Sequence, residues 1–345
     1  MRIRNFRVVS AAVVIMLTAA ACSSNGSSNA TLDSSTNITL AVVPSVNNTP
    51  AYIAQYEGFF AQQGLHVTIK SMASSAVVIA DQLKGSIDIC AGAYLPYISK
   101  EAKGAKFTIL AEGSVMGQNA RVLMVGPNSH ITSLRQLEGK TIGQEATNSI
   151  GTLLVNALLS ENGVSPSSVT YVTSPTGFKT LAKDLTAGKY EAAFFGEPFA
   201  TQAEEKYGDQ VLADLDQGSV QGLPITGFTA TNKWVAAHPA AAAAFARAIE
   251  EAQRVAATDV PTLRAAIDKS DDLPPVVGQV IALPGFPIGS DNETRLQRAA
   301  DAMLQFGLLD PKYASVVRNG SLIKSMIDPG LQAEIAAGQS DTSGN

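Results

Sequence analysis

The feature that most constrains the fold of this chain is an internal duplication. The order of segments in residues 38–88 recurs in residues 140–191, at an offset of about 100 residues. Each copy predicts a strand, an amphipathic helix that ends at a glycine, a second strand, a second helix and a third strand. Strands and helices in repeated alternation form parallel sheets covered by helices. The duplication therefore predicts two similar α/β lobes with a cleft between them.

The predicted elements of the two copies match one by one. The first copy contains the strand 38–43, the helix 51–63, the strand 67–69, the helix 76–84 and a strand that holds Asp88. The second copy contains the strand 140–143, the helix 150–162, the strand 169–171, the helix 178–187 and a strand that holds Glu191. Gly64 and Gly163 follow the first helix of each copy, where a left-handed residue ends a helix at little cost.

The remaining segments predict how the lobes connect. A strand at 107–112 runs through 113–117 into a new strand at 121–125, and a second path leads from 211–215 to 224–227. Helices are expected at 239–258, 262–269 and 293–306, and the first is rich in alanine, the strongest helix former. We expect residues 37–117 and 227–335 to form lobe one and residues 118–226 to form lobe two. Two crossover strands then act as a hinge, and residues 336–345 form a frayed tail.

The first 21 residues are typical of a signal peptide. Three arginines within the first seven residues precede an apolar run of about 14 residues, shorter than the about 20 that span a bilayer. Cys22 follows three alanines, as in a bacterial lipobox, where the cysteine is lipidated. Ala19 stands where that pattern usually has Leu, so ordinary secretory cleavage stays open. Residues 22–36 consist mostly of Ser, Asn, Gly and Thr and are expected to be a flexible linker.

Composition argues against several classes of function. The chain has 25 Lys and Arg against 30 Asp and Glu, and three of the arginines lie in the signal peptide, so the mature net charge is −8. Nucleic acid is therefore not an expected partner. Cys90 lies in an apolar run and is expected to be a buried strand residue. The three histidines lack the spacing of metal sites, and no phosphate-binding, dinucleotide-binding or hydrolase motif occurs. We expect no metal, no cofactor and no catalytic residue.

A set of short motifs occurs across residues 37–310. They are PAYIA at 50–54, EGFF at 57–60, LKGSID at 83–88, LEGKTIG at 137–143, EPF at 197–199 and AHP at 237–239. Together they resemble the ABC-importer binding proteins for nitrate, sulfonates and taurine, a family that also contains thiamine-pyrimidine precursor binders. The resemblance implies a two-lobed, periplasmic-binding-protein-like fold of type II, each lobe a mainly parallel sheet with helices on both faces. It also implies a solute-binding protein, not an enzyme, that delivers its ligand to an importer permease.

The duplication also predicts where a ligand binds. In open α/β sheets ligands bind outside the carboxyl ends of the strands, so the loops 45–49, 71–75 and 92–94 face 145–149, 173–177 and 195–197. Helix N-termini in these loops can hold a sulfonate, carboxylate or nitrate. The predicted ligand-binding residues are Asn47, Asn48, Thr49, Ser74, Ser75, Tyr94, Thr147, Asn148, Ser149 and Glu197. For Thr49, Ser75 and Ser149, simple helix capping is the alternative.

Glu197 is expected to be the acid of the pocket. Its carboxylate can accept hydrogen bonds from a ligand amine or amidine, or it can cap the helix that Pro198 begins. Tyr94, Phe195 and Phe199 offer either an apolar or stacking wall or ordinary core. The basic residues near the predicted cleft, mainly Arg121 and Lys179, are few, which argues against a multiply charged anion.

Several alternatives for ligand and partner stay open. A taurine-like zwitterion suits helix N-termini at one end and Glu197 at the other, and we prefer this sulfonate or taurine class. An aminopyrimidine would suit Glu197 and the aromatic residues. A thiamine-pyrimidine synthase would need a reactive His and a Cys cluster, and a sensor subunit would signal to a receptor. We expect an exported monomer, held at the outer face of the cell membrane through lipid on Cys22 or else periplasmic.

Overall fold

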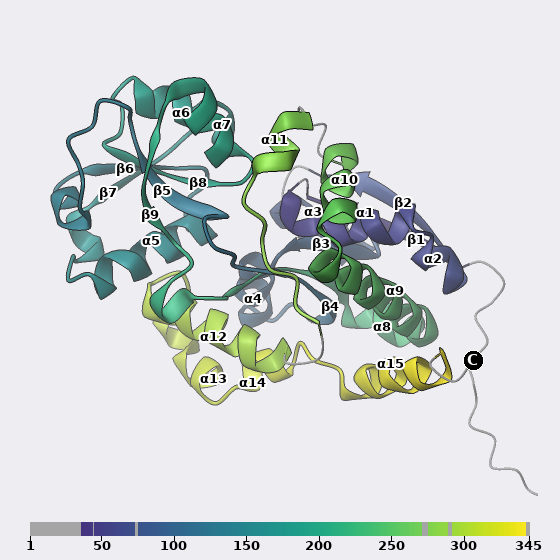
Figure 1. Ribbon diagram of the computed structural model, residues 1–345. Helices are drawn as coiled ribbons and strands as arrows, with labels where there is room; N and C mark the ends of the chain where they lie inside the picture. The colour runs from purple at the N-terminus through teal and green to yellow at the C-terminus, as the bar shows by residue number, and fades with distance from the viewer. Residues whose placement is uncertain (1–35, 44, 73–74, 271–274, 289–291, 343–345) are drawn as a thin grey trace, which may run out of the picture. The chain divides into compact units, whose positions relative to one another are not determined.

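Two five-stranded sheets organise the fold (Figure 1). The computed structural model of the protein describes residues 36–43, 45–72, 75–270, 275–288 and 292–342. The first sheet has the order β2-β1-β3-β10-β4, formed by β1 (Thr36–Val42), β2 (Leu65–Ser71), β3 (Ile89–Ala93), β4 (Phe107–Val115) and β10 (Pro224–Thr231). The second has the order β7-β6-β8-β5-β9, formed by β5 (Arg121–Val125), β6 (Thr141–Gln144), β7 (Thr170–Thr173), β8 (Ala192–Gly196) and β9 (Gln210–Asp214).

The two sheets share one topology. In the first sheet β1 pairs in parallel with β2 and β3, and in the second β6 pairs in parallel with β7 and β8. Each sheet also contains one antiparallel strand: β10 lies between β3 and β4, and β5 lies between β8 and β9. The mainly parallel sheets predicted from the duplication are therefore confirmed. The chain crosses between the sheets twice, after β4 and after β9.

A matching pair of carboxylates reinforces this symmetry. The Thr39 N–H donates to Asp88 Oδ2 at 2.8 Å, and the Thr141 N–H donates to Glu191 Oε2 at 2.9 Å. In return, the N–H groups of Asp88 and Glu191 donate to the carbonyl oxygens of the same threonines. Each acid stands one residue before its strand rather than inside it. Both acids therefore join the third strand of a copy to the first.

The helices expected from the sequence are present in the predicted order, one of them in two pieces, together with several that were not predicted. The bounds are α1 (Thr49–Tyr56), α2 (Phe59–Gln62), α3 (Ser75–Lys84), α4 (Tyr94–Ala102), α5 (Ile150–Glu161), α6 (Phe178–Thr186), α7 (Phe199–Tyr207), α8 (Asn232–Ala237), α9 (Pro239–Thr258), α10 (Val260–Ser270), α11 (Pro275–Val280), α12 (Asn292–Gln305), α13 (Ala314–Arg318), α14 (Ser321–Lys324) and α15 (Pro329–Thr342). The helix expected over 51–63 is interrupted at Gly58, whose φ of 76° lies in the left-handed region. The helix α15 includes residues 336–342, which the sequence predicts to fray.

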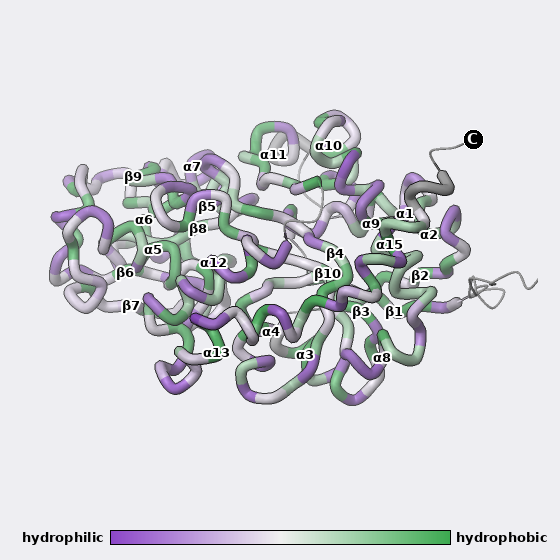
Figure 2. Tube along the Cα trace, turned by 90° about the horizontal axis from the view of Figure 1, so that it is seen from below, coloured by the Kyte–Doolittle hydropathy of each residue, from purple (hydrophilic) through white to green (hydrophobic). Residues whose placement is uncertain are grey.

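Helices cover both faces of each sheet, because neighbouring strand residues point to opposite faces. On the first sheet, Leu40 packs in the cluster of α1, α9 and α10, while Ala41 packs in the cluster of α3, α4 and α12. On the second sheet, Met124 packs with α6 and α7, while Leu123 packs on the side of α5. Figure 2 shows α5 as a largely hydrophobic segment, and nine of its residues are buried.

The predicted signal peptide, Cys22 and most of the linker lie outside the described residues. Within the part of the chain that the structure describes, no helix combines the length and the apolar character needed to cross a membrane.

Candidate functional site

A cavity of about 220 Å³ lies where strands of both sheets end. Its lining residues are Val43, Ser45, Asn47, Arg121, Glu145, Ile150, Phe178, Phe194, Gly196, Glu197, Pro198 and Phe199. Glu145 directly follows β6, and Glu197 directly follows β8. Arg121 begins β5, whose antiparallel direction brings its first residue to the same edge. The cavity therefore occupies the place where open α/β sheets bind ligands.

Two larger hollows lie elsewhere. One of about 600 Å³ is bordered by α8 and the start of α15, and its charged lining residues are the acids Asp328 and Glu334. Another of about 380 Å³ lies along α2 and the edge strand β2. Neither hollow touches the carboxyl ends of both sheets, so the smaller cavity is the better candidate site.

Arg121 is the buried cation of the cavity. The residue is 8% exposed, and burial lowers the pKa of its guanidinium to about 10, while the Glu145 charge opposes this shift. The guanidinium is therefore protonated at neutral pH. Its Nη1 donates to Asn47 Oδ1 at 3.4 Å, but its Nε has no hydrogen-bond partner among the described residues. A buried charged donor without a partner is costly, so this group is suited to a ligand acceptor.

Asn47 connects the cavity wall to β4, which precedes the first crossover, and to β10, which follows the second. Its Nδ2 donates to Ser45 Oγ at 2.7 Å, and its Oδ1 accepts from Ser114 Oγ at 3.1 Å. Its carbonyl oxygen accepts from Thr226 Oγ1 at 3.2 Å. Ser114 lies near the end of β4 and Thr226 lies in β10. Asn47 thus links the first sheet, the start of β5 and the cavity.

Glu197 lines the cavity, but its carboxylate is already hydrogen-bonded by the protein. The Thr201 N–H donates to Oε2 at 3.1 Å, and Thr201 Oγ1 donates to Oε1 at 2.9 Å. The Ala282 N–H also donates to Oε1, at 3.0 Å. Burial raises the pKa of Glu197, and the hydrogen bonds from Ala282 and Thr201 oppose that shift. Glu197 therefore caps the start of α7, as one of the two sequence interpretations has it, and connects α7 to the segment after α11.

Glu145 is a second acid of the cavity, which the sequence reasoning did not select. Its Oε2 is buried and has no hydrogen-bond partner in the described part of the chain. Burial raises the pKa of Glu145, while a hydrogen bond from Ser149 and the charge of Arg121 oppose the shift. The sequence did carry a signal for this residue, because Glu145 is the first residue of the predicted loop 145–149.

Asn48 and Thr49 are buried next to the cavity but do not line it. Asn48 Nδ2 donates to the Val43 carbonyl oxygen at 2.7 Å, and Thr49 Oγ1 donates to the Val46 carbonyl oxygen at 2.9 Å. These bonds hold the turn that places Asn47 in the cavity wall.

The other predicted residues of the second sheet lie outside the cavity. Thr147 and Asn148 are exposed, and Thr147 Oγ1 lies 3.0 Å from Thr173 Oγ1. Ser149 is the N-cap of α5 and accepts from the Gly151 N–H at 3.1 Å. The capping interpretation therefore describes Ser149 in this structure.

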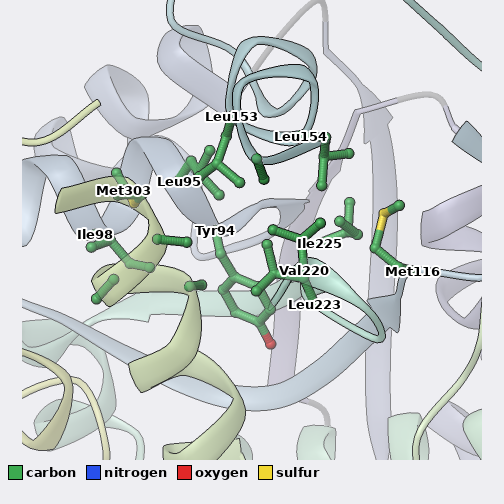
Figure 3. Close-up of a cluster of buried hydrophobic side chains, with 14 of the residues drawn as sticks. Tyr94, Leu95, Ile98, Met116, Leu153, Leu154, Val220, Leu223, Ile225 and Met303 are labelled. Atoms are coloured by element: carbon green, nitrogen blue, oxygen red, sulfur yellow. The ribbon is translucent and has the colours of Figure 1, made fainter. Parts of the chain in front are cut away.

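Ser75 and Tyr94 contact other parts of the protein and do not line the cavity. Ser75 Oγ accepts from the Ala93 N–H at 3.0 Å, which ties the start of α3 to the end of β3. Tyr94 is 0% exposed and lies in a cluster of buried hydrophobic side chains (Figure 3). It is therefore a core residue rather than a cavity wall, and its ring packs against the backbone of β10 at Gly227. Ser74 lies outside the described residues.

The apolar wall comes from aromatic residues of the second sheet and its helices. The rings of Phe178 and Phe199 stack with centroids 4.9 Å apart, and Phe194 lies 5.9 Å from Phe178. Phe178 begins α6 and was not predicted to contact a ligand. Among the described residues, no three His, Cys, Asp or Glu side chains gather as a metal site requires.

Comparisons with known proteins found similarity to proteins that are named as binding proteins. A curated relative from Bacillus subtilis (strain 168), named putative binding protein YtlA, is 23% identical over 213 residues. The match covers 62% of this chain and 64% of that relative, so the chain spans less than two thirds of the relative's length.

Two solved structures have the same fold. The periplasmic nitrate-binding protein NrtA from Synechocystis PCC 6803 is similar with a TM-score of 0.70, 16% identity and coverage of 88% of each chain. The alkanesulfonate-binding protein SsuA from Xanthomonas axonopodis pv. citri, bound to MOPS, is similar with a TM-score of 0.64 and 17% identity, covering 79% of this chain and 94% of that one.

These likenesses establish a two-lobed fold of the periplasmic binding proteins, as expected from the sequence. The family model described as NMT1/THI5 like matches residues 45–260, which is more than half of the chain. This protein therefore belongs to the NMT1/THI5-like family.

Proposed function

We propose that this chain is the extracytoplasmic solute-binding lipoprotein of an ABC importer. It captures a small polar organic anion or zwitterion of the sulfonate, taurine or nitrate class between its lobes and delivers it to a permease. Its work is selection by lobe closure rather than chemistry. One observation carries this proposal: Arg121 is buried in a cavity between the two sheets, and its Nε has no partner in the described structure.

The size and the charge of the cavity support a small anionic group. Its volume of about 220 Å³ is below the about 300–1,000 Å³ of pockets for drug-sized ligands. Arg121 is the cationic side chain of the lining, and a guanidinium binds sulfonate or carboxylate oxygens strongly. The relatives named for nitrate and alkanesulfonate support the same ligand class.

The proposal extends to the organisation of the chain. From the sequence we expected lobe one over 37–117 plus 227–335 and lobe two over 118–226. We now propose that lobe two ends at about residue 223 and that lobe one resumes at Pro224, since Pro224 pairs with Val115 in the first sheet. Removal of residues 1–21 and lipidation of Cys22 would tether the monomer to the outer face of the membrane through the linker 22–36.

An aminopyrimidine is a second candidate ligand because the cavity also carries a stacked aromatic wall. Phe178 and Phe199 offer ring faces, and Glu145 offers a carboxylate oxygen without a partner. A flat ring with an amino group could use both. The same groups would also accept the alkyl stem and the ammonium of a zwitterion, so the two classes need to be compared directly.

Isothermal titration calorimetry of the purified full chain tests the proposal. The panel contains taurine, ethanesulfonate, nitrate and an aminopyrimidine. We expect one member of the sulfonate, taurine or nitrate class to bind. Arg121→Gln should weaken that binding by at least about 30-fold, because a buried charge partner contributes about 2–5 kcal/mol.

Arg254→Gln is the matched control, since this arginine lies on α9 and is about half exposed. It should leave affinity unchanged. Binding of the aminopyrimidine alone would favour the second candidate. Absence of binding across the panel, or an Arg121→Gln variant that binds as tightly as the wild type, would refute the proposed ligand class.

A further inference from the structure

We infer that Glu145, and not Glu197, receives a cationic group of the ligand, so that the ligand is a compact zwitterion held between Arg121 and Glu145. This inference rests on the proposed function and narrows its substrate class. It also moves the ammonium-binding role away from the residue that the sequence indicated.

The two acids of the cavity differ in how many of their acceptor positions the protein uses. Glu197 accepts three hydrogen bonds from the protein, at 2.9 to 3.1 Å, from Thr201 and Ala282. Glu145 has a hydrogen bond from Ser149, but its buried Oε2 has no partner in the described residues. A buried acceptor that remains unpaired costs free energy, so a donor from the ligand would stabilise Glu145 more than Glu197.

Arg121 and Glu145 line the same cavity but do not neutralise each other by contact. Both residues are described, and no ion pair within 4.0 Å joins them. Each instead keeps one buried polar atom unpartnered, Nε on the arginine and Oε2 on the glutamate. Two opposite charges that share a cavity without touching leave room for a ligand that carries both complementary charges.

A simple anion would satisfy only half of this arrangement. Its oxygens could accept from Arg121, but its charge would repel the nearby Glu145 carboxylate. A zwitterion presents an anionic group to Arg121 and an ammonium to Glu145. Aminosulfonates and amino carboxylates share this chemistry, and both are included in the test.

The rest of the lining is suited to a short apolar stem between the two charges. Phe178 and Phe199 stack at 4.9 Å on one side of the cavity, and Val43 and Ile150 add aliphatic surface. The cavity of about 220 Å³ restricts the stem to a few carbon atoms. Glu197 then acts as a positioning residue, because it holds the start of α7, which carries Phe199.

Two pairs of matched ligands test the inference by calorimetry on the full chain. Taurine is compared with ethanesulfonate, and β-alanine with propionate, so each pair differs by one ammonium group. We expect taurine or β-alanine to bind the wild type at least about tenfold more tightly than its partner without the amine. Glu145→Gln should abolish this preference, whereas Glu197→Gln should retain it even if both ligands bind more weakly.

The outcomes separate this inference from the proposed function. Equal binding of the two members of a pair, a preference that survives in Glu145→Gln, or one that disappears only in Glu197→Gln would overturn the inference and leave a solute-binding protein. No binding of any of the four ligands would overturn the inference, and the proposed function would fail as well only if nitrate also did not bind. Circular dichroism melts of each variant confirm folding, and Glu145→Gln should fold because it removes a buried charge.

Discussion

Cys90 illustrates at the residue scale how burial decides chemistry. It lies in β3 and is 0% exposed, which confirms the buried strand residue predicted from its apolar surroundings. Burial raises the pKa of its thiol to about 12, opposed by a hydrogen bond with Tyr97. The thiol is therefore protonated at neutral pH, and thiolate is the reactive form. Cys90 does not supply the reactive cysteine that the pyrimidine-synthase alternative would need.

A pH-dependent stability is expected from Asp209, which is 3% exposed. Its Oδ1 accepts from Thr186 Oγ1 at 2.9 Å, whereas its Oδ2 is unpartnered within the described residues. Burial raises its pKa from 3.8 to about 6. Since the folded state holds this proton more tightly, the contribution to stability is largest below pH 4 and is lost as the pH rises through about 6.

Asp209→Asn should therefore raise the free energy of unfolding by about 1–2 kcal/mol at pH 7.5, with the gain disappearing near pH 3.5. Urea unfolding at the two pH values measures this difference. Asp301→Asn, at an exposed position on α12, is the control. An Asp209→Asn variant that is equally stabilised or destabilised at both pH values would contradict the assignment.

At the element scale, regular periodicity predicted most helices and strands. The bounds of α9 agree with the prediction 239–258, because its alanines favour helix and the preceding Pro239 suits a first helical position. The break at Gly58 was missed, since amphipathic spacing continues through it and the left-handed turn depends on how α2 packs. The crossover between β4 and β5 was located correctly, but its packing against residues 283–285 depends on contacts far along the chain.

Gly117→Ala should destabilise the crossover after β4. A Cβ at this position would lie 2.4 Å from the Leu283 carbonyl oxygen and 3.1 Å from Pro284 Cα, and backbone atoms cannot move aside easily. We expect the free energy of unfolding to fall by about 2–3 kcal/mol, a value typical of overpacking. Thermal or urea unfolding measures this loss. Gly126→Ala is the matched control, since its nearest atom would be 3.4 Å away. Equal free energies of unfolding for the two variants would contradict the predicted clash with the backbone of residues 283–284.

At the scale of the whole molecule, one hydrophobic cluster includes residues from both sheets. Leu153 and Leu154 of α5 belong to the same buried cluster as Met303 of α12 and Ile225 of β10. Figure 3 shows these side chains together with Leu223 from the segment before β10. Because the cluster is shared, we expect the two sheets to unfold together rather than as separate units.

The single tryptophan makes this cooperativity measurable. Trp234 lies in α8, directly after β10 of the first sheet, while Leu154 lies in α5 over the second sheet. Leu154→Ala should lower the free energy of unfolding by about 2–4 kcal/mol, because it leaves a buried cavity. It should therefore lower the urea midpoint followed by Trp234 fluorescence. Circular dichroism should shift equally.

Leu83→Ala, at a position 54% exposed, is the control and should change neither midpoint. A Trp234 midpoint that stays constant in Leu154→Ala, with a second transition in circular dichroism, would mean that the lobes unfold independently.

Features that repeat over short distances along the chain were predictable from the amino-acid sequence. The duplication predicted two similar sheets, and the carboxyl-end rule predicted the loops around Asn47, Glu145 and Glu197 that border the cavity. These predictions succeed because hydrophobic periodicity and helix-ending glycines are local properties of the chain, and the duplication repeats them in both halves of the fold.

Which side chains keep free hydrogen-bonding positions depends on tertiary contacts. Glu197 meets the N–H of Ala282, 85 residues further along, and Arg121 meets Asn47, 74 residues earlier. For the same reason Tyr94, expected at the pocket, lies in the core, and Glu145, which was not selected from its predicted loop, lines the cavity. Free donors and acceptors depend on neighbours from distant parts of the chain, and no local pattern encodes those neighbours.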